Sequence, residues 1–237
     1  MSVLRHFVAR RGGIARWVVA MLAGFGLFVA APAVPQSRWK AGIHYEVLPA
    51  EKAIGGRNGR VRVLEFFSYP CGSCYTLEPA ISAWQRSRAQ LVELVRVPVV
   101  YLPQVRAYAR LHYTLQALGR SDLNPEIYDS LYRKGRALQA ASEAETFALQ
   151  LAFAREHGIE ERQFTAAYES RAVADALRDA DLLTRFYLVE GTPTLVIAGR
   201  YKSMAGQAGG YEELIALADE LARAEYRRCC ADRGEVK

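Results

Sequence analysis

The feature that most constrains this chain is a pair of cysteines, Cys71 and Cys74, placed between an apolar run and a helical stretch. The run 61–67 is apolar enough for a buried strand, and residues 75–87 can form a helix. A CxxC motif that opens a helix puts its first thiol among the free N–H groups of the helix N-terminus, which stabilise a thiolate. The second thiol lies one turn further on, close enough to attack a mixed disulfide on the first. The pattern predicts a dithiol redox centre.

The first 33 residues differ in kind from the rest. They hold four arginines, no acidic residue, an uncharged run over 17–31 and the cleavage-type sequence Ala31-Pro32-Ala33. We predict an export signal peptide over 1–33 and a periplasmic location, where a disulfide can persist. An uncleaved membrane anchor is the alternative, although the run is short of the roughly 20 residues that a spanning helix needs. Without the four arginines the net charge falls from +6 to +2. No basic, aromatic-rich segment then indicates nucleic acid binding.

Strand and helix signals divide the remainder of the chain. Residues 42–102 show a β-β-α-β pattern, 103–187 are helical, and 188–228 show β-β-α, with a short tail over 229–237. Neither α/β part can bury its strands alone. We therefore predict one discontinuous α/β domain, formed by the first and third parts, that is interrupted by an inserted all-helical domain.

Local signals refine this outline. A short strand is expected over 44–48, and Pro98 should end the hydrogen-bonded part of a later strand. In the helical part, Ser142 and Glu145 have the spacing of a capping box, and Asn124, followed by a proline, is predicted to cap another helix.

A structural zinc site is the main competing interpretation of the CxxC motif. It requires four ligands. The remaining cysteines, Cys229 and Cys230, are adjacent, and His44, His112 and His157 show no ligand spacing. We expect no metal and no cofactor. A disulfide between neighbouring cysteines is strained, so the last pair is expected to be two thiols on a frayed tail, with a link to another chain or an auxiliary redox pair left open.

A second motif, Gly191-Thr192-Pro193-Thr194, precedes the returning strand, and its X-Pro bond is predicted to be cis. With this motif, the helical insert, and Leu-Glu-Phe-Phe-Ser-Tyr-Pro-Cys-Gly-Ser-Cys-Tyr at 64–75, the sequence resembles the thioredoxin superfamily. It is most similar to the DsbA-like thiol-disulfide oxidoreductases over residues 43–228. The Glu-Phe-Phe-Ser stretch is more specific than the CxxC. The resemblance implies an α/β, thioredoxin-like fold with an inserted all-helical domain.

The resemblance also implies roles for individual residues. Cys71 would be the exposed nucleophile and Cys74 the resolving thiol. Pro193 would be a cis proline beside the disulfide, and Thr192 would offer backbone groups to an extended substrate. Glu65 matches a buried acid whose raised pKa lets it relay a proton to or from Cys74. The alternative for Glu65 is a surface-facing strand residue.

This chain departs from the family pattern between the two cysteines. DsbA proteins usually carry Pro-His there, whereas this chain has Gly72 and Ser73. Gly72 makes the helix start less rigid, and Ser73 supplies a hydrogen bond but no positive charge. We predict a less depressed Cys71 pKa and a less oxidising centre. In the family, a basic residue often pairs with the buried acid. Arg96 occupies the matching position on the next strand in one register, and Leu94 occupies it in another register, in which case the basic partner is absent.

The resemblance implies an exported, monomeric enzyme that transfers its Cys71–Cys74 disulfide to reduced, folding exported proteins. Reoxidation would come from a quinone-linked membrane protein that resembles DsbB. The same site can instead act as a disulfide reductase or isomerase. From a different class comes a non-catalytic binding module in which the disulfide is structural.

Overall fold

The computed structural model describes residues 37–52 and 58–229. The signal peptide predicted over 1–33 and residues 230–237 of the predicted tail lie outside the described residues. Within the described part, no helix combines the length and apolar character needed to cross a membrane.

A five-stranded sheet forms the centre of the described part, in the order β1-β5-β4-β2-β3. The strands are β1 (Glu46–Val47), β2 (Val61–Phe67), β3 (Val92–Pro98), β4 (Thr194–Ile197) and β5 (Tyr201–Met204). β2 pairs in parallel with β3 and antiparallel with β4. Because β2 and β4 come from opposite sides of the helical segment, the prediction that both α/β parts build one sheet is confirmed.

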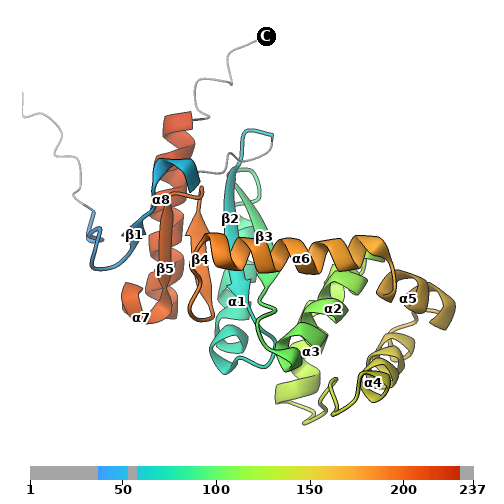
Figure 1. Ribbon diagram of the computed structural model, residues 1–237. Coiled ribbons are helices and arrows are strands. Elements are labelled where there is room, and N and C mark those ends of the chain that lie inside the picture. Colours follow the sequence, from blue (N-terminus) through green and yellow to red (C-terminus); the bar gives the residue numbers. More distant parts are fainter. Residues whose placement is uncertain (1–36, 53–57, 230–237) are drawn as a thin grey trace, which may run out of the picture. The chain divides into compact units, whose positions relative to one another are not determined.

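Five longer helices, α2 to α6, follow β3 and precede β4 in the chain (Figure 1). The helical elements are η1 (Ala50–Lys52), α1 (Gly72–Ser87), α2 (Pro103–Ala117), η2 (Ser121–Leu123), α3 (Asn124–Tyr132), α4 (Glu143–Glu156), α5 (Glu161–Tyr168), α6 (Arg171–Phe186), α7 (Ala205–Ala208) and α8 (Tyr211–Cys229). Figure 1 shows α6 crossing in front of the sheet and α8 behind it. The thioredoxin-like α/β fold with inserted helices is thus confirmed.

Alternate side chains of β2 pack on opposite faces of the sheet. Val63 belongs to a buried cluster with residues of α1 and α8, whereas Leu64 and Phe66 belong to another cluster with residues of α6. A strand that is covered on both faces is largely apolar, which explains why five of the seven residues of β2 are apolar.

A third buried cluster lies at the carboxyl end of β2. It joins Phe67, Tyr69 and Cys74 to apolar side chains of the inserted helices, including Leu111 and Ile127. The insert therefore closes over the end of the sheet where the CxxC motif begins.

Two local predictions are confirmed. Pro98 is the last residue of β3. Ser142 caps α4, since its Oγ accepts a hydrogen bond from the N–H of Glu145, and the capping box is complete.

Of two other local predictions, one is wrong and the other gives a strand that is too long. Asn124 does not cap α3: it lies inside the first turn, the N-cap position is Leu123, and no side chain caps this helix. The Asn124 side chain instead accepts a hydrogen bond from Tyr69 in the protein interior. The strand expected over 44–48 is limited to the two residues of β1, Glu46 and Val47, which pair with Lys202 and Tyr201 of β5.

Candidate active site

The two cysteines of the motif differ in exposure. Cys71 is the N-cap residue of α1, with an extended backbone, and its side chain is half-buried. Cys74 lies in the first turn and is fully buried. The N–H groups of Cys74 and Tyr75 both donate to the Cys71 carbonyl, at 3.0 and 3.1 Å. Both thiols are free in this structure. The first sulfur is open to a partner, whereas the second is shielded behind it.

The same two residues have opposite pKa shifts. The pKa of Cys71 falls from an ordinary 9.0 to about 5. A hydrogen bond from the Cys74 thiol is the largest cause; burial opposes it, and the Thr192 side chain and the N–H groups of Cys74 and Ser73 add to it. The pKa of Cys74 is raised far above its usual value, first by its hydrogen bond with Cys71 and then by burial. At neutral pH the outer sulfur is a thiolate and the inner one a thiol.

Gly72 and Ser73 separate the cysteines. Gly72 is exposed, and a Cβ built there would meet no atom within 4 Å. Ser73 is half-buried and stabilises the Cys71 thiolate through its backbone N–H. The space around Gly72 therefore admits a side chain.

The proline loop lies directly beside the outer cysteine. The Thr192–Pro193 peptide bond is cis, as the sequence predicted. In its thiol form, Cys71 donates from Sγ to the carbonyl oxygen of Thr192 at 3.3 Å. The fold thus brings together two motifs that lie 121 residues apart.

Glu65 is buried in β2, with 1% of its surface exposed. It alternates with Leu64 and Phe66, so its side chain faces α1 rather than α6. Its pKa is raised from 4.5 to about 7; burial is the largest cause, the charge of Arg96 opposes it, and the charge of Glu78 adds to it. The predicted burial and raised pKa of this carboxyl group are confirmed, and the surface-facing alternative is wrong.

Arg96, not Leu94, is the basic partner of the buried acid. It stands opposite Glu65 in the β2–β3 register, and its Nε lies 3.2 Å from Glu65 Oε2. This is an ion pair without the alignment of a hydrogen bond. A terminal nitrogen of Arg96 also lies 3.1 Å from Oε1 of Glu78 in α1. Glu78 was not selected from the sequence, although it follows Cys74 by four residues and so shares its helix face.

A second buried polar group, also missed by sequence reasoning, lies beneath the turn that leads to Cys71. The Tyr69 hydroxyl is 2.9 Å from Nδ1 of His112 in α2 and 2.9 Å from Oδ1 of Asn124 in α3. Burial, and then the charge of Arg96, lower the pKa of His112 to about 3, so the imidazole is neutral. No local signal could have found these contacts, because the three residues come from separate segments.

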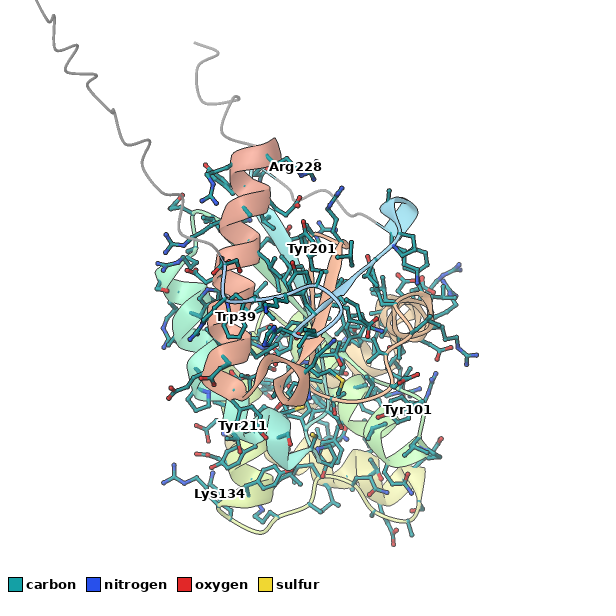
Figure 2. All side chains as sticks on the ribbon, turned by 90° about the vertical axis from the view of Figure 1, so that its left-hand side faces the viewer. Trp39, Tyr101, Lys134, Tyr201, Tyr211 and Arg228 are labelled. Atoms are coloured by element: carbon teal, nitrogen blue, oxygen red, sulfur yellow. The ribbon has the colours of Figure 1, made fainter. Side chains whose placement is uncertain are left out.

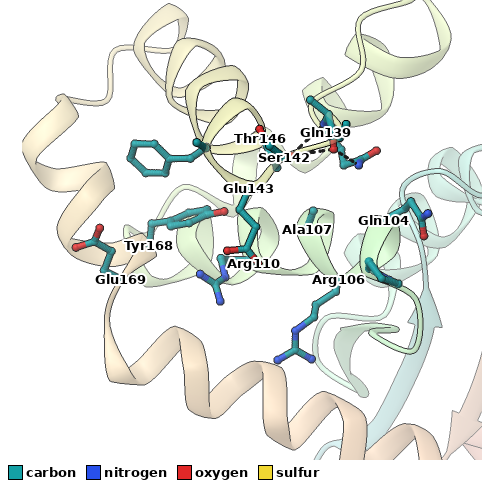
Figure 3. Close-up of a pocket in the computed structure, with 15 residues that line it drawn as sticks. Gln104, Arg106, Ala107, Arg110, Gln139, Ser142, Glu143, Thr146, Tyr168 and Glu169 are labelled. Carbon is teal, nitrogen blue, oxygen red and sulfur yellow. Dashed lines mark hydrogen bonds between the residues drawn. The ribbon is translucent and has the colours of Figure 1, made fainter.

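A hollow of about 560 Å³ lies within the inserted helices, between α2, the start of α4 and the end of α5 (Figure 3). Arg106 and Arg110 line it, and the Arg110 guanidinium lies 5.1 Å from the centre of the Tyr168 ring. None of the predicted active-site residues, which are Cys71, Gly72, Ser73, Cys74, Glu65, Thr192 and Pro193, lines this hollow. Across residues 37–52 and 58–229, no group of three or more His, Cys, Asp or Glu side chains could hold a metal ion.

Known proteins share this arrangement of sequence and fold. The model of the family described as DSBA-like thioredoxin domain matches residues 62–222. The thiol:disulfide interchange protein DsbA of Burkholderia cepacia is 32% identical over 180 residues, which cover 75% of this chain and 80% of that protein. DsbA of Azotobacter vinelandii is 31% identical over 210 residues, 87% of this chain and 95% of the relative. The crystal structure of Pseudomonas aeruginosa DsbA is similar with a TM-score of 0.71 at 27% identity, covering 80% of this chain and 96% of that one.

Proposed function

Since this chain belongs to the family of DSBA-like thioredoxin domains, we propose that it is a protein thiol-disulfide oxidoreductase that introduces disulfides into reduced polypeptides through Cys71 and Cys74. One observation carries the proposal: a half-buried Cys71 with a pKa of about 5 stands one turn before a fully buried Cys74. This pairing makes the outer sulfur both the point of attack and a good leaving group.

The reaction starts from the disulfide form of the protein. A substrate thiolate attacks Sγ of Cys71, the Cys71–Cys74 bond breaks, and its electron pair passes to Sγ of Cys74. The mixed disulfide is then attacked, at the substrate sulfur, by a second thiolate of the same substrate. The electron pair leaves on Cys71, whose low pKa favours its departure. In sum the substrate loses two electrons and two protons, and the protein becomes a dithiol.

Glu65 is proposed to supply the proton that Cys74 needs when its sulfur is released. The buried sulfur favours the thiol strongly, because its pKa is raised far above the usual value. A carboxyl group with a pKa of about 7 is partly protonated at neutral pH and can give up this proton. Arg96 and Glu78 position and tune the carboxyl group, since one lowers and the other raises its pKa.

Thr192 and Pro193 are proposed to contact the substrate. The Thr192 carbonyl lies at the reacting sulfur, where it can pair with an extended segment as an added strand would. Pro193 has no N–H and so leaves the loop without a competing donor beside Cys71.

The substrates are proposed to be reduced exported proteins in the periplasm. The support is the segment 1–33, with its arginines and apolar run, read as a signal peptide with an uncleaved anchor as the alternative. A DsbB-like, quinone-linked membrane protein is proposed to restore the disulfide, and the protein is proposed to act as a monomer.

A single-turnover experiment tests the proposed direction. The oxidised protein is mixed with an equimolar reduced, unfolded test protein, and free thiols are counted after acid quenching. We expect disulfides to appear in the test protein while the protein gains two thiols. A redox titration against glutathione buffers then separates a disulfide donor from a reductase. A potential as negative as that of a dedicated reductase would overturn the proposed direction.

A further inference from the structure

Methionine is rare in this chain, and one methionine lies close to the proline loop. The sequence holds three methionines, of which Met1 and Met21 fall within the segment predicted to be a signal peptide. Met204 is the third. A thioether is readily oxidised to the sulfoxide, which turns an apolar, flexible side chain into a polar, chiral one. The surroundings of Met204 therefore decide what such an oxidation would do.

Met204 is the last residue of β5 and the N-cap residue of α7. In the β4–β5 register it stands opposite Thr194, which directly follows Pro193. Residues paired across antiparallel strands point their side chains to the same face. Figure 2 shows the chain leading from Tyr201, at the start of β5, down to α7 and Tyr211. The end of β5 thus lies beside the proline loop.

The methyl group of Met204 packs against Gly191 of that loop. A Cβ built on Gly191 would lie only 2.9 Å from Cε of Met204, closer than two such atoms approach. The methyl group therefore fills the space that a side chain at position 191 would need. From the other side, Oγ1 of Thr194 donates a hydrogen bond of 2.7 Å to the Gly191 carbonyl. Gly191 is held between these two groups.

The position of Gly191 matters for the reacting sulfur. Gly191 is joined by one peptide bond to Thr192, whose carbonyl oxygen lies 3.3 Å from Sγ of Cys71. Glycine has no side chain of its own with which to anchor the loop. A displacement of Gly191 is therefore passed directly to the contact between Thr192 and Cys71.

We propose that Met204 is a modification site, and that oxidation of its sulfur to the sulfoxide slows thiol-disulfide exchange at Cys71 by displacing the proline loop. The inference rests on the proposed function and adds a regulation to it. Met204 is a positioning residue in this scheme, because it acts through Gly191 rather than on the sulfur of Cys71.

The oxidant is a hydroperoxide, with hydrogen peroxide as the simplest case. A lone pair on Sδ attacks one oxygen of the peroxide, and the O–O bond breaks. The first oxygen stays on sulfur and gives up its proton, and the second leaves as water. The sulfur loses two electrons, which the peroxide gains. The half-buried position of the Met204 side chain leaves part of its surface open to a small oxidant.

The new oxygen conflicts with the packing at Gly191. A sulfoxide oxygen is a strong hydrogen-bond acceptor, and burying it without a donor is costly. The flexible side chain can turn so that this oxygen reaches water, but turning withdraws Cε from Gly191. If the side chain does not turn, the larger group presses on the loop. Both responses move Gly191 and with it Thr192.

Peroxide treatment of the wild-type protein and Met204→Leu tests the proposal. Both proteins are prepared as the Cys71–Cys74 disulfide, with Cys229 and Cys230 blocked by N-ethylmaleimide, so that no thiol competes for the oxidant. Mass spectrometry of proteolytic fragments measures the sulfoxide at Met204. The rate constant for oxidation of a reduced dithiol peptide is then compared with that of the same protein before treatment.

The wild-type rate constant should fall between about tenfold and a hundredfold, as expected when reacting groups are misplaced by about 1 Å. Met204→Leu should lose nothing on treatment, because leucine fills a similar volume and carries no sulfur. Met1 and Met21 are common to the two full-length chains and cannot account for the difference. Repair by methionine sulfoxide reductases, followed by reoxidation of the disulfide, should restore the wild-type rate.

The titration of Cys71 gives a readout that a merely structural role of Met204 would not move. Thr192 helps to hold the pKa of Cys71 at about 5. Once the disulfide of the peroxide-treated protein is reduced, thiolate absorbance against pH should therefore give a higher Cys71 pKa than in the untreated protein. An unchanged pKa would overturn the proposed displacement of the loop.

Three other results would overturn the inference. They are an unchanged peptide rate when Met204 is fully converted to the sulfoxide, an equal loss of rate in Met204→Leu, and no reaction of Met204 with peroxide that oxidises free methionine. Failure of the proposed function looks different. In that case the untreated wild-type disulfide would oxidise neither dithiothreitol nor the peptide.

Discussion

The active site has an open front and a closed back, and the two are built on different physical principles. At the front, Cys71 is half-buried, and hydrogen bonds lower its pKa to about 5. At the back, Cys74 and Glu65 are fully buried, and both have raised pKa values. Only one helical turn separates the two sulfurs. Burial and hydrogen-bond partners, rather than the spacing of the motif, decide which sulfur reacts.

Charge is also divided between the two regions. The back places Glu65, Arg96 and Glu78 around one buried position, whereas the front relies on backbone N–H groups and a neighbouring thiol. Buried charges act strongly because little water screens them. Changes of charge at the back should therefore alter stability and its pH dependence in addition to any effect on reactivity, whereas changes at the front should alter reactivity most.

The largest effect is expected when Cys71 and Cys74 are each replaced by serine. Cys71→Ser should slow oxidation of a reduced peptide at least about a thousandfold, because a hydroxyl cannot form the mixed disulfide. Cys74→Ser should still attack a substrate disulfide, and the mixed disulfide should accumulate because no second thiol releases it. Mass spectrometry after acid quenching measures both species. Equal trapping by the two variants would remove the distinction between front and back.

The next effect concerns the buried carboxyl group. The pKa of the Glu65 carboxyl group is about 7 in the folded state, against 4.5 for the same group in the unfolded chain. Between these pH values the folded state keeps a proton that the unfolded state has released. The free energy of unfolding should therefore fall as pH rises through this window, by about 3 kcal/mol.

Glu65→Gln removes this titration. Relative to the wild-type protein, the reduced variant should gain about 3 kcal/mol in unfolding free energy between pH 4 and pH 8. Urea unfolding of both proteins at the two pH values measures the difference, and the titration of Cys71 cancels because both proteins share it. A difference that does not change with pH would show that folding does not shift the pKa of Glu65.

A smaller loss is expected from Tyr69→Phe, at the base of the turn between the two regions. The variant leaves His112 Nδ1 and Asn124 Oδ1 without their shared partner in a buried site, which should lower the free energy of unfolding by about 1–3 kcal/mol. Tyr128→Phe is the matched control, because that buried hydroxyl has no hydrogen-bond partner among the described residues. Equal losses for both variants would contradict a role for the hydrogen bonds.

The smallest effect is expected at the front. Ser73→His places an imidazolium beside the outer thiolate and should lower its pKa by about one unit from its value of about 5. Thiolate absorbance against pH measures the shift, and a lower pKa should also make the disulfide more oxidising. Ser73→Asn controls for side-chain size. A similar shift in both variants would exclude charge as its cause.

Features that depend on neighbouring residues could be predicted from the sequence. The apolar run of β2, the CxxC opening of α1 and the capping box of α4 each lie within one segment, and each was found. The prediction failed at Asn124, where the local signal indicates a cap. Its side chain bonds Tyr69 instead, because a buried hydroxyl from another segment needed a partner.

The partner of Glu65 shows a different limit. Side chains on a strand alternate with a period of two, so Arg96 and Leu94 would face the same side. A shift of two residues in register keeps the hydrophobic pattern intact, and the sequence cannot choose between them. Pairing of β2 with β3 chose Arg96.

The sequence by itself determined which chemical groups the site contains and how they are spaced along α1 and the proline loop. Tertiary structure alone decided how deeply each group is buried and which charges it meets. The physical reason is that burial, strand register and hydrogen-bond partners arise from segments that meet only in the folded chain, as Cys71 and Thr192 do across 121 residues.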